Sequence, residues 1–310
     1  MSSLLYNVPL SKTKRVILDS DVKNEADDPF AILYALLSPS LDVRGIIATH
    51  FGKDRVKDSM ERSFEELTRL LEVSGWKGKV VAVKGAAECL QEVEKGYYAT
   101  PEPICTEGVR LILEEVHNLP CNEKLYIAVL GPLTNVASAL LMEPGIAHRL
   151  TIVWNGGGCY PDGGMEFNLV NDIVAAGIVL KSECEIWQIP VNRYNSVRVG
   201  VAELQRRVLP CKKAGEYLFQ LVVGFLEEME HERDWPRPES LDICDLTAVG
   251  VLLEPHDYGY HYQEAPEISG DMGYMYQQCN RPIRIYDSID GRYLWEDFLA
   301  KLQIEYMDAC

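Results

Sequence analysis

The sequence has little basic charge and no long apolar run. Its 310 residues include 30 lysines and arginines against 47 aspartates and glutamates, which gives a formal net charge of −17. A nucleic-acid backbone or an anionic membrane surface would be repelled over most of such a protein. No stretch of about 18 uninterrupted apolar residues occurs, and the N-terminal residues do not resemble a signal peptide. The expected partners are therefore small molecules that are neutral or cationic, with no nucleic acid and no membrane.

The cysteines also exclude two kinds of architecture. There are nine of them, an odd number, and they are widely spaced without any C-x-x-C pair. A disulfide framework or a zinc cluster would need closer and more regular spacing. We therefore expect reduced thiols and a cytoplasmic protein.

The sequence does contain an alternation of short apolar runs with helical patterns. The runs are rich in β-branched residues and are typical of buried parallel strands; they lie at 15–18, 43–49, 80–83, 125–130, 150–154 and 186–190. Helical patterns lie between them, at about 28–38, 54–73, 104–118, 133–142 and 171–182. This order predicts an α/β fold with an open, mostly parallel sheet flanked by helices.

After residue 195 the rhythm changes. Helices are expected near 200–208, 212–232 and 241–253, followed by a tyrosine-rich segment at 258–276, a strand at 282–287 and a last helix at about 291–305. We see no internal repeat, low-complexity tract or clear linker. The prediction is a single domain over 1–310, with a core at about 14–195 and a C-terminal helical cap with further elements at about 196–310.

Four polar loops are expected to meet at one edge of this sheet, because ligands bind beyond the carboxyl ends of parallel strands. They are the acidic loop after residue 18, THFGKD after the second run, LGPLTN after the fourth, and NGGGCYPDGGMEFN after the fifth. All four are candidates for the wall of one pocket.

The acidic loop, DSDVKNEADD at 19–28, concentrates like charge. Asp19 and Asp21 lie two residues apart at a strand end, and Asp27 and Asp28 open the next helix. Carboxylates packed this closely could not all stay ionised without a cation, and a hard divalent ion with oxygen ligands is the simplest remedy. For any single aspartate the alternative is a solvated turn or a helix cap.

Two other motifs share features with this loop. An EF-hand would need glycine and glutamate where Asn24 and Phe30 stand, so it is excluded. A strand that ends in D-x-D is also similar to a haloacid-dehalogenase-type phosphotransferase, in which Asp19 would be the nucleophile. The closing acidic pair of that family comes much later in the chain than Asp27 and Asp28 do.

Four segments in order resemble the inosine-uridine-preferring nucleoside hydrolase family. They are VILDSDVKNEADDPFAI, LGPLTNVASAL at 130–140, GGG at 156–158 with MEFN at 165–168, and CDLTAVGVLLEP at 244–255. The resemblance spans about residues 15–255 and is that of a divergent member. It implies Ca²⁺-dependent hydrolysis of the N-glycosidic bond of ribonucleosides or a related N-riboside, by a homodimer or homotetramer.

The resemblance also implies roles for particular residues. Asp21 would both bind Ca²⁺ and take a proton from the attacking water. The other metal ligands would be carboxylates of Asp28 and Asp245 and the main-chain carbonyl of Leu130. Contacts to the ribose hydroxyls and to the 5′ end of the sugar would come from Asp27, Asn168 and Glu166. Asn135 and Asp172, by contrast, are expected to have structural roles, at a helix start and as a helix cap.

The sequence departs from the family pattern at four places, one of which is the glycine-rich loop, where a second expected asparagine is absent from CYPDGG. Five residues, VKNEA, separate D-x-D from D-D instead of three, so part of this longer loop is expected to enter the pocket. Lys53 stands where an asparagine is common. Cys244 stands where many members carry the histidine that protonates the departing base, and a thiol is a poorer general acid.

Other acids or lid residues are available in the cap. The candidates are histidines and aromatic residues that could protonate or stack on a base: His231, His256, His261, Trp235, Tyr258, Tyr260 and Tyr262. Two alternatives to the main hypothesis stay open at this point. One is the same fold acting on a different glycoside or modified nucleoside, and the other is a catalytically silent sugar-binding or nucleoside-binding relative. A phosphotransferase is a more distant third.

Overall fold

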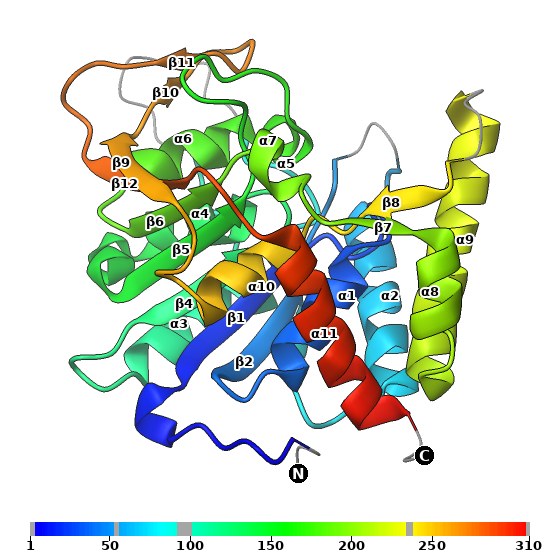
Figure 1. The fold of residues 1–310 in the computed structure, drawn as a ribbon. Coiled ribbons are helices and arrows are strands. Elements are labelled where there is room, and N and C mark those ends of the chain that lie inside the picture. The colour runs from blue at the N-terminus through cyan, green and yellow to red at the C-terminus, as the bar shows by residue number, and fades with distance from the viewer. Residues whose placement is uncertain (1–3, 53–55, 92–100, 234–237, 308–310) are drawn as a thin grey trace.

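The computed structural model describes residues 4–52, 56–91, 101–233 and 238–307, and a large β-sheet runs through its middle (Figure 1). Within these residues the sheet has eight strands. In spatial order they are β3 (Ala82–Lys84), β2 (Leu41–Ala48), β1 (Lys14–Ser20), β4 (Leu125–Val129), β5 (Leu150–Asn155), β6 (Glu185–Ile189), β12 (Pro282–Tyr286) and β9 (Tyr260–Glu264). All neighbours pair in parallel except β9, which is antiparallel to β12. The predicted fold class is confirmed.

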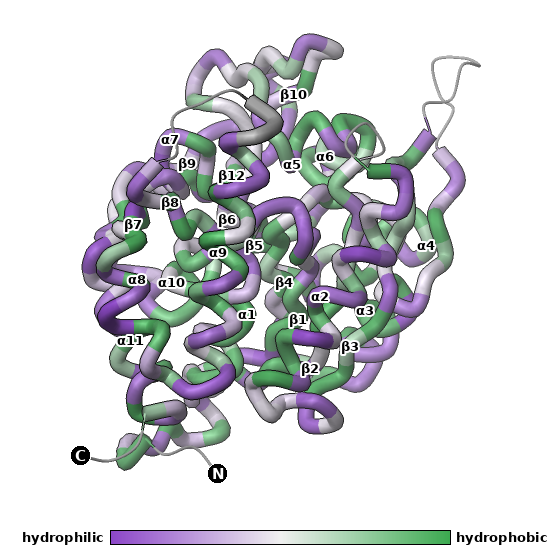
Figure 2. The backbone as a smooth tube through the Cα atoms, turned by 90° about the vertical axis from the view of Figure 1, so that its right-hand side faces the viewer, coloured by the Kyte–Doolittle hydropathy of each residue, from purple (hydrophilic) through white to green (hydrophobic). Residues whose placement is uncertain are grey.

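The alternating side chains of β1 explain why this strand is central. Val16 and Leu18 point into one hydrophobic core and Ile17 into the other, and all three are fully buried. A strand with both faces covered is apolar throughout, as the sequence pattern indicated. Figure 2 shows the hydrophobic colouring gathered along these central strands.

Helices cover both faces of the sheet. The core that contains Val16 is covered by α1 (Asp28–Leu37), α2 (Ser59–Val73), α8 (Val201–Arg207), α9 (Lys212–Arg233), α10 (Leu246–Leu253) and α11 (Gly291–Tyr306). The core that contains Ile17 is covered by α3 (Glu107–His117), α4 (Thr134–Met142) and α6 (Ile173–Lys181). No helix in the described residues is both long and apolar enough to cross a lipid bilayer.

The order β3-β2-β1-β4-β5-β6 places the functional end of the sheet. The chain leaves β1 toward β2 on one side, whereas β4 pairs with the other side of β1. Such a reversal opens a crevice beyond the carboxyl ends of the two strands, and ligands bind there in open α/β sheets. The loops after β1, β4 and β5 therefore converge, as expected, whereas the described part of the loop after β2, residues 49–52, does not contribute to the wall of that crevice.

Short elements complete the chain. They are the 3-10 helices at Leu10–Lys12 and Pro144–Arg149, the helices α5 (Phe167–Asn171) and α7 (Val191–Tyr194), and the strands β7 (Arg198–Gly200), β8 (Ser240–Asp242), β10 (Glu267–Ile268) and β11 (Tyr274–Met275). Several predicted helices are shorter than expected; the 54–73 helix, for example, begins only at Ser59 and the 104–118 helix at Glu107. The 241–253 helix begins only at Leu246 because β8 occupies its start, and the 171–182 helix begins at Ile173, where Asp172 caps it.

Tyr260 and Tyr262 lie in a strand of the sheet, which corrects the sequence-based expectation that these two residues belong to a lid. Both lie on the edge strand β9, and their rings surround the guanidinium of Arg284. Arg284 Cζ lies 4.2 Å from the ring centre of Tyr260 and 4.3 Å from that of Trp187 on β6. These aromatic faces stabilise a buried cation within the sheet, so they are not available to stack on a base.

Candidate active site

The acidic loop connects the end of β1 with the start of α1. A hydrogen bond from the main-chain N of Asn24 to the carbonyl of Asp21, 2.7 Å long, closes its first turn. At the other end Ser20 Oγ donates to Asp28 Oδ1 at 2.5 Å, which ties the strand end to the first residue of the helix. The loop thereby directs several carboxylates toward the crevice beyond the sheet.

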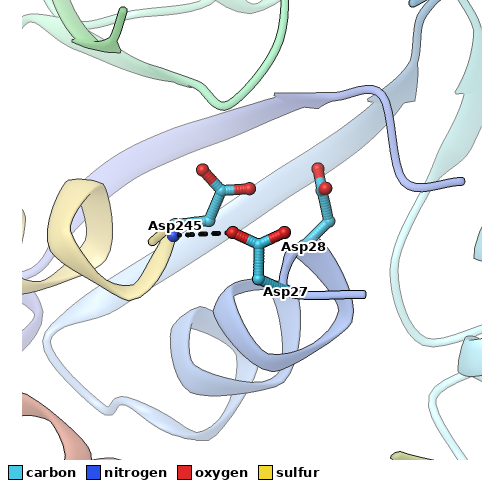
Figure 3. A group of neighbouring side chains, drawn as sticks. All are labelled: Asp27, Asp28 and Asp245. Atoms are coloured by element: carbon cyan, nitrogen blue, oxygen red, sulfur yellow. Dashed lines mark hydrogen bonds between the residues drawn. The ribbon is translucent and has the colours of Figure 1, made fainter. Parts of the chain in front are cut away.

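Three of the aspartates gather at two helix starts (Figure 3). Asp27 and Asp28 begin α1, and Asp245 directly precedes α10. Each offers a carboxylate oxygen that lies within 4.8 Å of the others, and all three side chains are buried. The main-chain N of Asp245 donates to Asp27 Oδ2 at 3.3 Å. Two helix N-termini, each with a partial positive charge, therefore face this group of carboxylates.

Asp21 lies beside this group at the end of β1. Its side chain is only 1% exposed, and its Oδ2 has no hydrogen-bond partner. Gly131 packs closely against this side chain: a Cβ atom at position 131 would lie 3.1 Å from Asp21 Cγ. A buried carboxylate oxygen without a partner is costly, so Asp21 Oδ2 is an open ligand position.

Burial and mutual repulsion raise the pKa values of these acids. Burial raises the pKa of Asp28 to about 7, and it also raises those of Asp21, Asp27 and Asp245 well above the ordinary range, with neighbouring carboxylates adding to the effect. Four such groups cannot all be ionised at neutral pH without positive charge among them. The donor set fits a hard divalent cation.

Leu130 lines the same space. Leu130 follows β4, and its N donates to the carbonyl of Asp19 at 2.8 Å, which fixes its position beside β1. Its carbonyl accepts a 2.9 Å bond from Asn168 Nδ2. Since a carbonyl has two lone pairs, one remains for a further partner.

Glu166 organises the glycine-rich loop after β5. Its carboxylate accepts from the main-chain N of Gly157 at 2.8 Å, from those of Asn168 and Leu169 at the start of α5, and from Tyr194 Oη at 2.7 Å. Gly157 has φ +85°, and a Cβ there would lie 2.2 Å from Gln188 Nε2, so glycine is required. The loop is therefore held by Glu166 in one conformation.

Asn155, at the end of β5, links Asp245 to the loop that carries Asn168. Its Nδ2 donates to Asp245 Oδ1 at 3.1 Å, and its Oδ1 accepts from Thr247 Oγ1 at 3.0 Å. Its main-chain carbonyl accepts a 2.9 Å bond from Asn168 Nδ2. Sequence reasoning missed both Asn155 and Tyr194. The rule that strand ends carry ligands could have indicated Asn155, whereas no local signal marks Tyr194.

Cys244 is held at the rim of the cluster. Its Sγ donates to Asn195 Oδ1 over 3.1 Å, and burial together with Asp27 and Asp245 raises the pKa of the thiol. The position that the family resemblance assigns to a proton donor is therefore occupied by a protonated thiol whose hydrogen is already directed at Asn195.

These residues line a cavity of about 430 Å³. Its described lining comprises Asp21, Asn24, Glu25, Asp27, Asp28, Leu130, Asn155, Glu166, Phe167, Asn168, Val191, Tyr194, Asn195, Phe225, Met229, Leu241, Asp242, Cys244 and Asp245. Seven of the residues singled out by the resemblance for metal or sugar binding are thus brought together, and Cys244 lies with them. From the longer acidic loop, Asn24 and Glu25 enter the cavity, as expected.

The remaining candidates lie elsewhere. Lys53 and Trp235 are outside the described residues, and of His231 only its place in α9 is described. His256 and His261 are not among the described lining of the cavity, and His261 Nδ1 lies 2.8 Å from Asp287 Oδ2. These two histidines are therefore not positioned to protonate a base.

The two residues expected to be structural are structural. Asp172 caps α6 by accepting from the main-chain N of Ala175 at 2.8 Å, as predicted. Asn135, fully buried within α4, donates to Asp19 Oδ1 at 3.0 Å and to Thr49 Oγ1 at 3.1 Å. Asp19 supports the loop and is not part of the cavity lining, so it is not placed as a nucleophile.

The fold and the site together define a class. A buried group of carboxylates, a backbone carbonyl and a glycine-rich loop meet at the switch point of an open α/β sheet, an arrangement typical of a hydrolase that uses a bound cation to activate water. The family model described as inosine-uridine preferring nucleoside hydrolase matches residues 16–296. The chain belongs to this family and is a hydrolase of N-glycosyl bonds.

Individual relatives agree with this assignment. The chain is 26% identical over 268 residues to the non-specific ribonucleoside hydrolase RihC of Salmonella paratyphi B, covering 79% of this chain and 80% of that protein. A purine-preferring ribonucleoside hydrolase from Gardnerella vaginalis has a similar fold, with a TM-score of 0.74 at 20% identity over 94% of this chain and 99% of that one. A plant nucleoside hydrolase, PpNRh1, gives a TM-score of 0.73 at 21% identity, over 93% and 98% of the two chains.

Proposed function

We propose that this protein hydrolyses the N-glycosidic bond of ribonucleosides, or of a closely related N-riboside, in a Ca²⁺-dependent reaction that releases base and sugar. The observation that carries the proposal is the group of buried carboxylates, Asp27, Asp28 and Asp245, beside the unpartnered Oδ2 of Asp21 in a chain of this family. Oxygen ligands only, and no nitrogen or sulfur ligand in the group, favour calcium over zinc.

The metal would be held by carboxylates of Asp21, Asp28 and Asp245 and by the carbonyl of Leu130. When bound, the cation would neutralise these carboxylates and make a coordinated water molecule more acidic. Asp21 Oδ2, buried and without a protein partner, would accept the proton of the attacking water. The remaining carboxylates would provide a negative field for the oxocarbenium-like sugar of the transition state.

The sugar would be held by the residues on either side of the cluster. Asp27 and Asn168 are proposed to bind the ribose hydroxyls, and Glu166 the 5′ end. Asn168 Nδ2 already donates to two main-chain carbonyls, which leaves its Oδ1 for a hydroxyl. Two aromatic side chains of the cavity, Phe167 and Phe225, offer faces for a planar base.

A second candidate, a larger or modified nucleoside, is favoured by a neighbouring cavity. This space of about 420 Å³ shares Asn24, Glu25, Phe225 and Met229 with the first cavity and continues between the acidic loop, α2 and α9. Its lining adds the charged or polar side chains of Lys23, Arg62, Gln220 and Glu228. A substituent on the leaving group could extend into it.

Ribose release tests the proposal. The wild-type protein, stripped with a chelator and reloaded with Ca²⁺, is assayed for reducing sugar on a panel of purine, pyrimidine and base-modified ribonucleosides. We expect turnover of at least one nucleoside, loss of activity on chelation, and a decrease of about 10³-fold or more in Asp21→Asn. Asp162→Asn, an exposed aspartate outside the cavity, is the matched control.

Two outcomes would change the assignment. Calcium binding without turnover of any nucleoside would favour the silent binding protein, and turnover that persists fully in chelator would refute calcium dependence.

We also infer a cytoplasmic homodimer or homotetramer of single-domain chains, as the resemblance implies. Light scattering on the purified protein checks the oligomeric state.

A further inference from the structure

Asn195 and Cys244 form a pair at the rim of the cavity that the proposed roles do not use. Asn195 follows the short helix α7, and Cys244 lies between β8 and α10, so 49 residues separate them in sequence. Cys244 Sγ lies 3.1 Å from Asn195 Oδ1. Both residues line the cavity.

The contact fixes the orientation of the amide. A thiol is a weak donor with a single hydrogen, and the other acceptor near Sγ, the carbonyl of Asp242, is more distant at 3.7 Å. Since the thiol donates to Oδ1, the Nδ2 group of Asn195 is turned the other way, with two hydrogens to donate. Asn195 is exposed, and its Nδ2 donates no hydrogen bond within the described part of the chain.

Asn195 and Cys244 lie between the proposed sugar side and the proposed metal side of the cavity. Tyr194, the residue before Asn195, bonds to Glu166 on the proposed sugar side, and Cys244 is followed by the metal carboxylate Asp245. With the proposed roles, an amide at Asn195 would lie on the cavity wall between the sugar side and the metal side, where the bond between sugar and base is expected. The neighbouring carboxylate of Asp242 is engaged by Arg198 Nε at 3.2 Å and is an acceptor, not a donor.

We propose that Asn195, oriented by Cys244, donates a hydrogen bond from Nδ2 to the departing base in place of a general acid. This inference rests on the proposed function. As the C1′–N bond breaks, its electron pair moves onto the base, where the amide stabilises the negative charge without giving up a proton. The attacking water bonds to C1′ and gives its proton to Asp21, and the base then takes a proton from solvent. Asn195 is the catalytic residue in this step, and Cys244 is a positioning residue.

Two substrates with different leaving groups test the proposal. Inosine must lose a basic nitrogen anion, whereas p-nitrophenyl riboside loses a phenolate that is stable without help. In Asn195→Leu we expect kcat/KM on inosine to fall about 100-fold, and that on p-nitrophenyl riboside to stay within about threefold of wild type. Asn195→Asp keeps the acceptor for the thiol but loses the donor, and should show the same selective loss.

Further variants separate positioning from packing. Cys244→Ala should lower inosine turnover by about tenfold and Cys244→Ser, which keeps a donor, should restore most of it. Asn192→Leu, on α7 but outside the described cavity lining, should leave both substrates unchanged. Equal losses on both substrates in Asn195→Leu, or no loss on either, would overturn the inference. If the wild-type protein turned over neither substrate, the proposed function itself would fail, and this inference with it.

Discussion

Replacing Asp28 with asparagine should make the calcium-free protein more stable, although it removes a ligand. In the metal-free protein burial raises the pKa of Asp28 from 3.8 to about 7. Keeping this carboxylate ionised in the folded state therefore costs about 4 kcal/mol at pH 8, an upper limit because its neighbours titrate with it. Asparagine keeps an acceptor for Ser20 Oγ and carries no charge.

The sign of the pH dependence follows from the raised pKa. Well below its ordinary pKa of 3.8 the group is protonated in both the folded and the unfolded state, so it costs nothing there. The cost grows as the pH rises from about 4 to about 7 and is complete above that. The stability advantage of Asp28→Asn over wild type in chelator should therefore be small at pH 4 and largest at pH 8.

Calcium should narrow this difference in stability. A ligand at 100 times its Kd stabilises the folded state by about 2.7 kcal/mol, which in a chain of this size is about 5 °C in Tm. With Ca²⁺ the wild-type protein should gain this increment, whereas Asp28→Asn should gain little of it. Urea and thermal unfolding followed by circular dichroism measure both quantities, with Asp162→Asn as the control that changes neither. A variant that is no more stable than wild type in chelator, and that responds to Ca²⁺ as wild type does, would refute the reasoning.

Three further substitutions give distinct outcomes. Asn155→Leu removes the donor to Asp245 Oδ1, and calorimetry should show Ca²⁺ affinity reduced by 10- to 100-fold. Unchanged affinity would show that Asn155 does not contribute to metal binding. Tyr194→Phe removes the 2.7 Å hydrogen bond to Glu166 and should raise KM for the nucleoside about tenfold with little change in kcat. An unchanged KM would contradict the proposed contact between Glu166 and the sugar. Asn135→Ala leaves buried partners unsatisfied, and urea unfolding should show a loss of about 2–3 kcal/mol; a loss below about 0.5 would contradict its structural role.

The core of the fold could be predicted because its strands are buried on both faces. Runs such as Val16 to Leu18 are apolar throughout, and a segment with helical periodicity separates each run from the next. The strands, the helices and their succession along the chain therefore follow from local patterns. The edge of the sheet could not be predicted in this way. On β9 the sequence YHYQE contains no apolar run, and the strand is recognisable only from its antiparallel pairing with β12, where Arg284 packs against Tyr260.

The site shows the same division. Asp21, Asp27 and Asp28 are concentrated in one loop, so the sequence alone indicated a cation there. Asn155 and Tyr194 are single residues in otherwise ordinary segments, and their roles arise from contacts with Asp245 and Glu166 that only the folded chain creates. The structure also groups Asp27 with Asp28 and Asp245, whereas the resemblance assigned Asp27 to the sugar and Asp21 to the metal. That division of roles stays a prediction.

The central claim is that calcium held by this group of carboxylates supports hydrolysis of an N-riboside. The most direct measurement titrates Ca²⁺ into chelator-treated protein while ribose release from a nucleoside substrate and the binding heat are followed together. The account predicts that both signals saturate at about one calcium ion per chain. Full ribose release before calcium is added, or saturated calcium binding with no release from any nucleoside, would contradict it.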